Sequence, residues 1–292
     1  MAWNPANLDS ISLLEQHAQE VLELEEREAR RLLRIYREIS GRLAYRIRNV
    51  KEESFSQQQA MVIMLQVQGA IKALQDKLGE QTNLVSKLMA DRSIEMLVKE
   101  TNTMNEYFQG AMQPIDLKAV LVTFDSENFL YNNYQASLET YSLDLRNRIS
   151  NGIQQMVVER QTPQQMIERL QQDRPIERFF EAEEWRLRRI VRTEMHSING
   201  KARLAGLKSI ESDSAPGMMK TLYHPLDGRT GEDSRFVQAL DLRVPLDTAF
   251  EYTFTPTRAD GSPGKPQHRV FMTPPDRPND RSILIPYHPS WD

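Results

Sequence analysis

The stretch RRIVRTEMHSINGKA, residues 188–202, combines a helical pattern with a carboxylate that such a pattern does not need. Apolar residues recur here at three- and four-residue steps, which gives a helix one apolar face: Leu187, Val191, Ile198, Ala202 and Ala205. Glu194 falls within this stripe, and a buried carboxylate is costly unless a cation or strong donors bind it. We therefore expect Glu194 to be buried and paired with Arg229, because an arginine can bind a carboxylate through two hydrogen bonds. Solvent exposure and a catalytic role for Glu194 are the alternatives.

Histidines and carboxylates in the last third of the chain are the next candidates for chemistry. Four of the five histidines lie there, with three aspartates near them in sequence: His196, His224, His268, His288, Asp227, Asp233 and Asp241. None has the HExxH spacing of a zinc site, and there is no cysteine to supply a thiolate. A G-x-S-x-G elbow and the phosphate-binding motifs GxxxxGK[ST] and GxGxxG are also missing. We expect no catalytic site, metal or cofactor; the alternative is a DNA-processing or hydrolytic enzyme that uses Glu194, His196, His224 and Asp227.

A basic segment near the N-terminus is a candidate contact with DNA or with a partner protein. Between residues 27 and 51 it carries several arginines at helical spacing, among them Arg30, Arg34, Arg37, Arg42 and Arg46. Such a face can bind phosphates, or it can be a solvated helix surface whose arginines pair with nearby acids. The whole chain has 37 basic and 41 acidic residues and a net charge of -4, so only weak, non-specific DNA binding is expected.

The elements that position these residues follow from the distribution of proline. Four prolines precede residue 216 and the other eleven lie from Pro216 onward, so long helices are expected before that point and not after it. We predict helices at about residues 7–50, 56–78, 80–109, 126–160, 162–171 and 176–208. Short antiparallel strands are expected in MMKTLYH, LRVPL, FEYTFT, HRVFM and SILIPY, with turn-rich segments such as DGRTGEDS between them.

These patterns predict a mainly α protein with a small α+β C-terminal lobe. Its regions are a long-helix part (1–112), a helical core with the RTE helix (113–211) and a strand-and-loop lobe with the DGRT turn (212–292). We expect no signal peptide and no membrane span, since no window approaches about 18 apolar residues. We also expect self-association, because the first helix should expose apolar residues such as Leu32, Leu33, Ile35 and Ile39 on more than one face.

The order of motifs resembles the minor head proteins of tailed bacteriophages, the head morphogenesis or Mu F-like family. The first matching feature is a helix with R-x-x-R-T-E followed by an asparagine, and the second is a D-x-R-T turn. The counterparts are Arg189, Arg192, Thr193, Glu194 and Asn199, followed by Asp227, Arg229 and Thr230. The resemblance extends to Phe250 and the proline-rich end MTPPDRPNDRSILIPY, and covers about residues 162–287.

Two departures limit what the resemblance implies. Many members have a histidine shortly after D-x-R-T, where this chain has Ser234 and Arg235, and many end in a Cys-Arg-Cys element that is absent here. The resemblance implies a non-enzymatic virion protein, made in the host cytoplasm and located at the portal vertex or in the head interior. It would bind the portal protein, the major capsid protein or, non-specifically, packaged DNA, and would aid head assembly, DNA packaging or ejection. A helical adaptor unrelated to phage is a further alternative.

Overall fold

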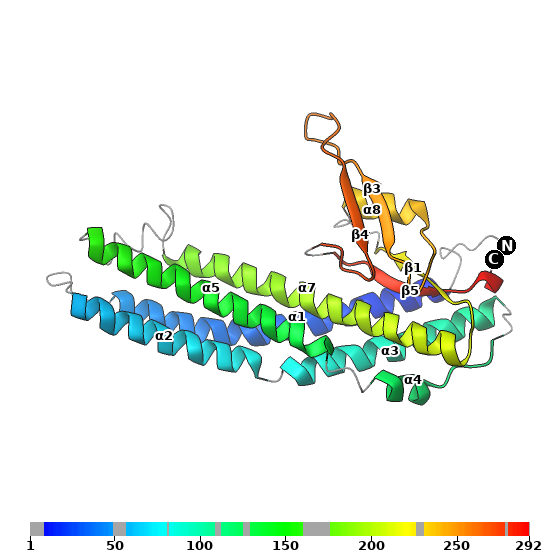
Figure 1. Cartoon of the computed structure of the whole chain (residues 1–292), viewed down its shortest axis with the longest axis horizontal. Coiled ribbons are helices and arrows are strands. Elements are labelled where there is room, and N and C mark those ends of the chain that lie inside the picture. The colour runs from blue at the N-terminus through cyan, green and yellow to red at the C-terminus, as the bar shows by residue number, and fades with distance from the viewer. Residues whose placement is uncertain are drawn as a thin grey trace. The chain divides into compact units, whose positions relative to one another are not determined.

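The computed structural model describes residues 9–48, 57–80, 82–108, 112–124, 129–159, 176–225, 231–277 and 280–291 (Figure 1). The chain is mainly helical, with short antiparallel strands near its C-terminus, as the sequence predicts. It forms two compact units that alternate along the chain. Unit 1 contains Met1–Glu25, Leu84–Leu130 and Arg192–Asp292, and unit 2 contains Glu26–Asn83 and Tyr131–Val191. The regions expected from the sequence (1–112, 113–211 and 212–292) are each continuous along the chain, unlike these two units.

Six helices precede the strands within the part of the chain that the structure describes. They are α1 (Asp9–Arg48), α2 (Gln57–Gly79), α3 (Thr82–Tyr107), α4 (Leu117–Phe124), α5 (Phe129–Glu159) and α7 (Ile176–Asp213). Five of them match predicted helices to within a few residues. The short α4 was not predicted, and the helix expected at residues 162–171 lies outside the described residues.

Unit 2 is built from helices, and its core contains residues that were expected to face solvent. Leu32, Leu33 and Ile39 of α1 are buried and Ile35 is partly buried, so the prediction that these four residues are exposed is wrong. In the same unit, α1 contacts α5 through Tyr36 and Tyr141, whose ring centroids are 6.4 Å apart. A helix with neighbours on more than one side buries a wider arc than a single stripe, and this places all four residues in or near the core.

Unit 1 contains every strand found among the described residues. β2 (Val244–Pro245), β1 (Met219–Tyr223) and β5 (Ile283–Tyr287) form an antiparallel sheet with β1 in the middle. β3 (Phe250–Phe254) and β4 (Gln267–Phe271) form a separate hairpin. Every residue of β5 is buried, which fits its continuous apolar run, whereas β3 alternates between buried and exposed residues. The strand predictions are therefore confirmed.

One helix of unit 1 replaces a segment that was predicted as turns. Residues 232–240 form α8 (Glu232–Leu240), which begins after Gly231 and has Glu232 and Asp233 in its first turn. Negative charges at that end favour a helix because they interact well with its dipole. The helix ends at Asp241, which adopts the left-handed conformation at φ 45°. The composition of DGRTGEDS, whose end overlaps α8, predicted turns because acidic residues suit turns and helix starts equally well.

Two glycines let α7 pack closely within unit 1. A Cβ atom on Gly200 would collide with the carbonyl oxygen of Pro274, in the segment before β5. A Cβ atom on Gly206 would come within 2.8 Å of the Leu97 side chain on α3. Glycine is a poor helix former, but at these two positions its lack of a Cβ atom allows close contact with neighbouring elements.

Candidate functional site

A row of buried polar side chains lies on the part of α7 that belongs to unit 1. His196, Asn199 and Arg203 are spaced by three and four residues, so they share one face of the helix. Their relative exposures are 4%, 0% and 0%. Each of them contacts a residue that is distant in sequence. We refer to these three residues as the polar ladder.

His196 occupies the first position of the polar ladder and has an oxygen at each ring nitrogen. Its Nδ1 lies 3.2 Å from a carboxylate oxygen of Glu25 on α1, and its Nε2 lies 2.5 Å from the backbone carbonyl oxygen of Ser282. A carbonyl oxygen only accepts, and so does an ionised carboxylate, so both ring nitrogens must carry protons. Burial opposes that charge, but Glu25, Asp280 and the Ser282 carbonyl outweigh it and raise the pKa of His196. These contacts favour the imidazolium form of His196, and the ring joins α1 to the start of β5.

The other two members of the polar ladder also join separate elements of unit 1. His17 of α1 donates from Nε2 to the side-chain oxygen of Asn199 at 3.3 Å. Arg203 donates from Nε to the carbonyl oxygen of Leu284 in β5 and binds both carboxylate oxygens of Glu100 in α3. The Arg203–Glu100 pair is completely buried, at 0% side-chain exposure for both partners. Such a pair fixes the arrangement of its elements more than it adds net stability, because desolvation offsets much of the attraction.

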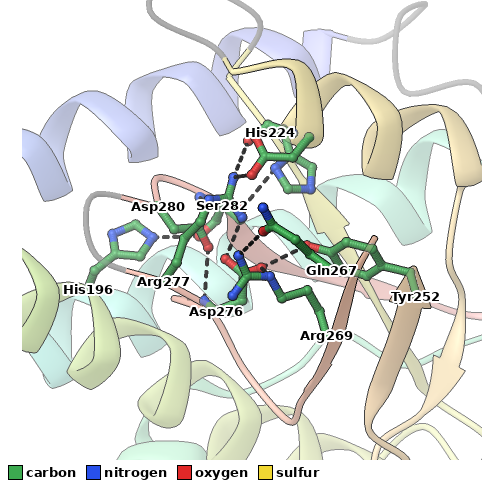
Figure 2. A network of polar contacts seen from close by, with 11 residues as sticks. His196, His224, Tyr252, Gln267, Arg269, Asp276, Arg277, Asp280 and Ser282 are labelled. Atoms are coloured by element: carbon green, nitrogen blue, oxygen red, sulfur yellow. Dashed lines mark hydrogen bonds and ion pairs between the residues drawn. The ribbon is translucent and has the colours of Figure 1, made fainter. Parts of the chain in front are cut away.

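Ser282 connects the polar ladder to a second buried histidine, as Figure 2 shows. The Ser282 hydroxyl donates to Asp280 and accepts a hydrogen bond from His224 Nδ1 at 2.8 Å. Burial lowers the pKa of His224 to about 4, so this ring is neutral at pH 7, in contrast to His196. Asp280 also accepts from the backbone N–H groups of Ser282 at 3.1 Å and Asp276 at 3.2 Å, which closes the loop before β5.

Arg277 extends this network to the β3–β4 hairpin and α8 (Figure 2). Its guanidinium binds Asp276 at 2.5 Å, Asp233 at 2.8 Å and the Ser234 hydroxyl at 2.9 Å. The Tyr252 hydroxyl of β3 donates to the other oxygen of Asp276 at 2.7 Å. One arginine and its acids therefore join the start of α8, a hairpin strand and the loop before β5.

The Ser282, His224 and Asp280 arrangement differs from a nucleophilic triad in the direction of its hydrogen bonds. In a triad, histidine accepts the serine proton and an acid orients the histidine. Here the serine proton goes to Asp280, and His224 donates to the serine oxygen. Ser282 is also buried at 2% exposure, and its contacts with Asp280 and His224 hold the start of β5 in place.

A pocket in unit 1 adjoins the polar ladder. It is bordered by α1, His196, the end of β1 and the residues around the start of β5, including Glu15, Gln19, Tyr223, Arg281 and Ile283. His196 lines it, but both of its nitrogens are engaged with Glu25 and Ser282. The ring therefore has no free nitrogen for a ligand in the pocket.

Of the predicted motif residues, Asn199 belongs to the polar ladder, and the described others lie elsewhere on α7. Glu194 is of intermediate exposure, so the expectation of full burial is not met. Arg192 is exposed and Thr193 is partly buried. In unit 2, the Arg189 guanidinium lies 5.4 Å from the centre of the Trp185 ring. Asp227, Arg229 and Thr230 lie outside the described residues, so the expected pair between Glu194 and Arg229 stays a prediction.

The predicted arginine face of α1 is exposed but mostly paired. In unit 2, Arg37 binds both oxygens of Glu184 at 2.8 and 2.7 Å, and Arg42 binds Glu38 at 2.8 Å. Arg30 lies 3.9 Å from Glu26, and Arg34 is exposed. The Arg46 side chain lies outside the described residues. This pattern favours the alternative in which the arginines pair with acids, although every described member also remains accessible to solvent.

From the sequence, Glu194 was the residue expected to be buried and paired, His196 was a candidate for chemistry, Asn199 was a motif residue, and Arg203 was not singled out. The available signal was the spacing of His196, Asn199 and Arg203, which repeats the three- and four-residue steps of the apolar stripe. Polar residues at such spacing fall on one face, and only their distant partners show that the face is buried.

Comparison with known proteins returned no matching family model, no matching curated protein and no matching solved structure. Among the described residues, no group of three or more histidines, aspartates or glutamates is arranged to hold a metal ion. No helix within those residues is long and apolar enough to cross a membrane.

Proposed function

We propose that this chain is a minor head protein of a tailed bacteriophage that acts by binding the portal or the head interior. What supports the proposal most is the order of its motifs: R-x-x-R-T-E, an asparagine, D-x-R-T and a proline-rich segment before a terminal strand. The geometry adds a physical reason for two of these features. Asn199 contacts α1, and the terminal strand β5 accepts a hydrogen bond from Arg203, so both take part in assembling unit 1.

Binding, rather than catalysis, also fits how the polar residues are used. His196, His224 and Ser282 are buried and bound to one another or to neighbouring elements, in an arrangement that holds β5. The enzyme alternative relied on Glu194, His196, His224 and Asp227 acting together. His196 has an oxygen partner at each ring nitrogen, and these contacts favour a structural role over that of a general base.

Portal binding is the direct test. The chain should co-purify with the portal protein of the same phage when the two are expressed together, and it should be present in purified virions at low copy number. A chain that is absent from virions and does not bind the portal would refute the proposal. The matched control is co-expression with the major capsid protein alone, which separates the two head partners.

Contact with packaged DNA is a second part of the proposal, supported by the solvent-exposed arginines on α1. Reversing the charge of Arg30, Arg34 and Arg37 should weaken binding by a similar factor for all DNA sequences, because no base-reading motif is recognisable. Binding should fall steeply as salt rises, since each phosphate contact releases counterions. Titrations at low and high salt test this: no binding at low salt, or salt-resistant binding with a sequence preference, would contradict it.

A further inference from the structure

The outer face of α2 in unit 2 exposes a group of large apolar side chains. Met61, Val62 and Leu65 are 61%, 53% and 59% exposed. The opposite face of the helix packs into the core of unit 2 through Val67, Ile71, Leu74 and Leu78. We refer to Met61, Val62, Leu65 and Gly69 as the α2 outer face; at 100° per residue these four lie on one side of the helix.

The absence of charge on this part of α2 is unusual for a helix surface. From Gln57 to Ile71 the sequence QQQAMVIMLQVQGAI contains no acidic, basic or histidine residue, and the first charged residue of the helix is Lys72. Exposed helix faces normally carry charges that keep a protein apart from its neighbours, and an apolar exposed patch indicates a binding surface. A second copy of the same helix can approach such a face without repulsion between like charges.

The spacing of residues on the α2 outer face also allows a second copy to pack against it. If two α2 helices pack antiparallel about a two-fold axis at Leu65, position 61 of each helix lies opposite position 69 of the other. Met61 would then project toward Gly69 of the second copy, and the two Leu65 side chains would meet at the axis. A Cβ atom added to Gly69 would meet nothing within 4 Å in this chain, so the space above Gly69 is open.

We propose that α2 binds a second copy of this chain through its outer face, antiparallel, with Leu65 on the two-fold axis. This inference goes beyond the proposed function and gives a site to the self-association that the sequence analysis expects. A closed two-fold contact uses the same patch on both copies, as this one does. A single pair of helices buries less than the roughly 1,200 Å² of a stable dimer interface, so the contact is weak and depends on concentration.

Engineered disulfides test the geometry directly, because the chain has no cysteine of its own. In an antiparallel pair centred on residue 65, the Leu65→Cys thiols of the two copies meet at the axis. Gln68→Cys is the matched control: Gln68 is exposed on the same helix, but its copies lie roughly 9 Å apart along the axis at about 1.5 Å per residue. A disulfide needs Cα atoms within about 7 Å, so Leu65→Cys should form covalent dimers at least about ten times faster under oxidation.

A second substitution tests the open space above Gly69. In the Leu65→Cys protein, Gly69→Gln should slow dimer formation about tenfold by blocking Met61 of the second copy. Helix content by circular dichroism should not fall, since glutamine favours a helix more than glycine does. Equal cross-linking by Leu65→Cys and Gln68→Cys, or a rate unaffected by Gly69→Gln, would overturn the proposal.

Failure of this proposal can be distinguished from failure of the proposed function. Portal co-purification of the Gly69→Gln protein should be unchanged, because the face is assigned to a second copy. If Gly69→Gln abolished portal binding while dimer formation persisted, the α2 outer face would belong to the portal and the dimer proposal would be wrong. If portal binding were absent for the unmodified chain while Leu65→Cys dimers formed, only the proposed function would fail.

Discussion

Removing the buried charge of His196 should destabilise unit 1 and change how its stability depends on pH. In His196→Gln, Glu25 loses its imidazolium partner while remaining 4% exposed, and the contact with the Ser282 carbonyl is weakened or lost. Breaking a buried charge pair by removing one partner costs about 3–5 kcal/mol. Glutamine can still donate a hydrogen bond, so we expect the free energy of unfolding to fall by about 3 kcal/mol, at the lower end of this range.

The pH dependence follows from the direction of the His196 pKa shift. Burial opposes protonation, but Glu25, Asp280 and the Ser282 carbonyl raise the folded-state pKa above the unfolded value of 6.5. A raised histidine pKa contributes stability that is fully present below about 6.5 and is lost as pH rises through the folded pKa. The unmodified chain should therefore lose more stability than His196→Gln does as pH increases from about 6 to about 9.

Denaturant unfolding of both proteins at several pH values measures this difference. His268→Gln is the control, because His268 is exposed in β4 and its nearest acid, Glu251, is exposed as well. The control should change stability by less than about 1 kcal/mol, as exposed pairs contribute little. Nitrogen NMR should show both His196 ring nitrogens protonated at pH 7. A neutral ring, or identical pH slopes for the unmodified chain and His196→Gln, would refute the assignment of a buried imidazolium.

Three further predictions concern the same unit. Arg203→Met should lower the free energy of unfolding by about 3–5 kcal/mol, because it leaves Glu100 buried and unpaired. Denaturant unfolding of the double variant with Glu100→Leu should show part of that loss recovered. No recovery would argue against the pair. Because the pKa of His224 is about 4 in the folded state, the free energy of unfolding should fall as pH drops from about 6.5 to about 4. Denaturant unfolding of His224→Gln in this pH range should lack that dependence on pH. Gly200→Ala should lower the melting temperature despite the better helix propensity of alanine, because its Cβ meets the Pro274 carbonyl; a raised melting temperature would contradict this close packing.

The sequence by itself determined which segments are helices and which are strands. Apolar spacing set most helix limits to within a few residues, and the crowding of prolines after residue 216 separated the helical part from the strands. These features are local: the period of the apolar residues and the rigid ring of proline act on the segment that contains them. The exceptions were the short α4, which was not predicted, and α8, where acidic residues suit a turn and a helix start equally well.

Only the tertiary structure decided which faces and which polar residues are buried. Leu32 and Ile39 were expected at the surface but lie in the core of unit 2. The spacing of apolar residues in a helix does not tell how many other helices pack around it. His196 and Arg203 are buried because Glu25, Glu100 and the carbonyl oxygens of Ser282 and Leu284 bind them, and those partners come from segments distant in sequence. Burying a charge is favourable only when its partners are already in place, and that depends on the packing of the whole unit.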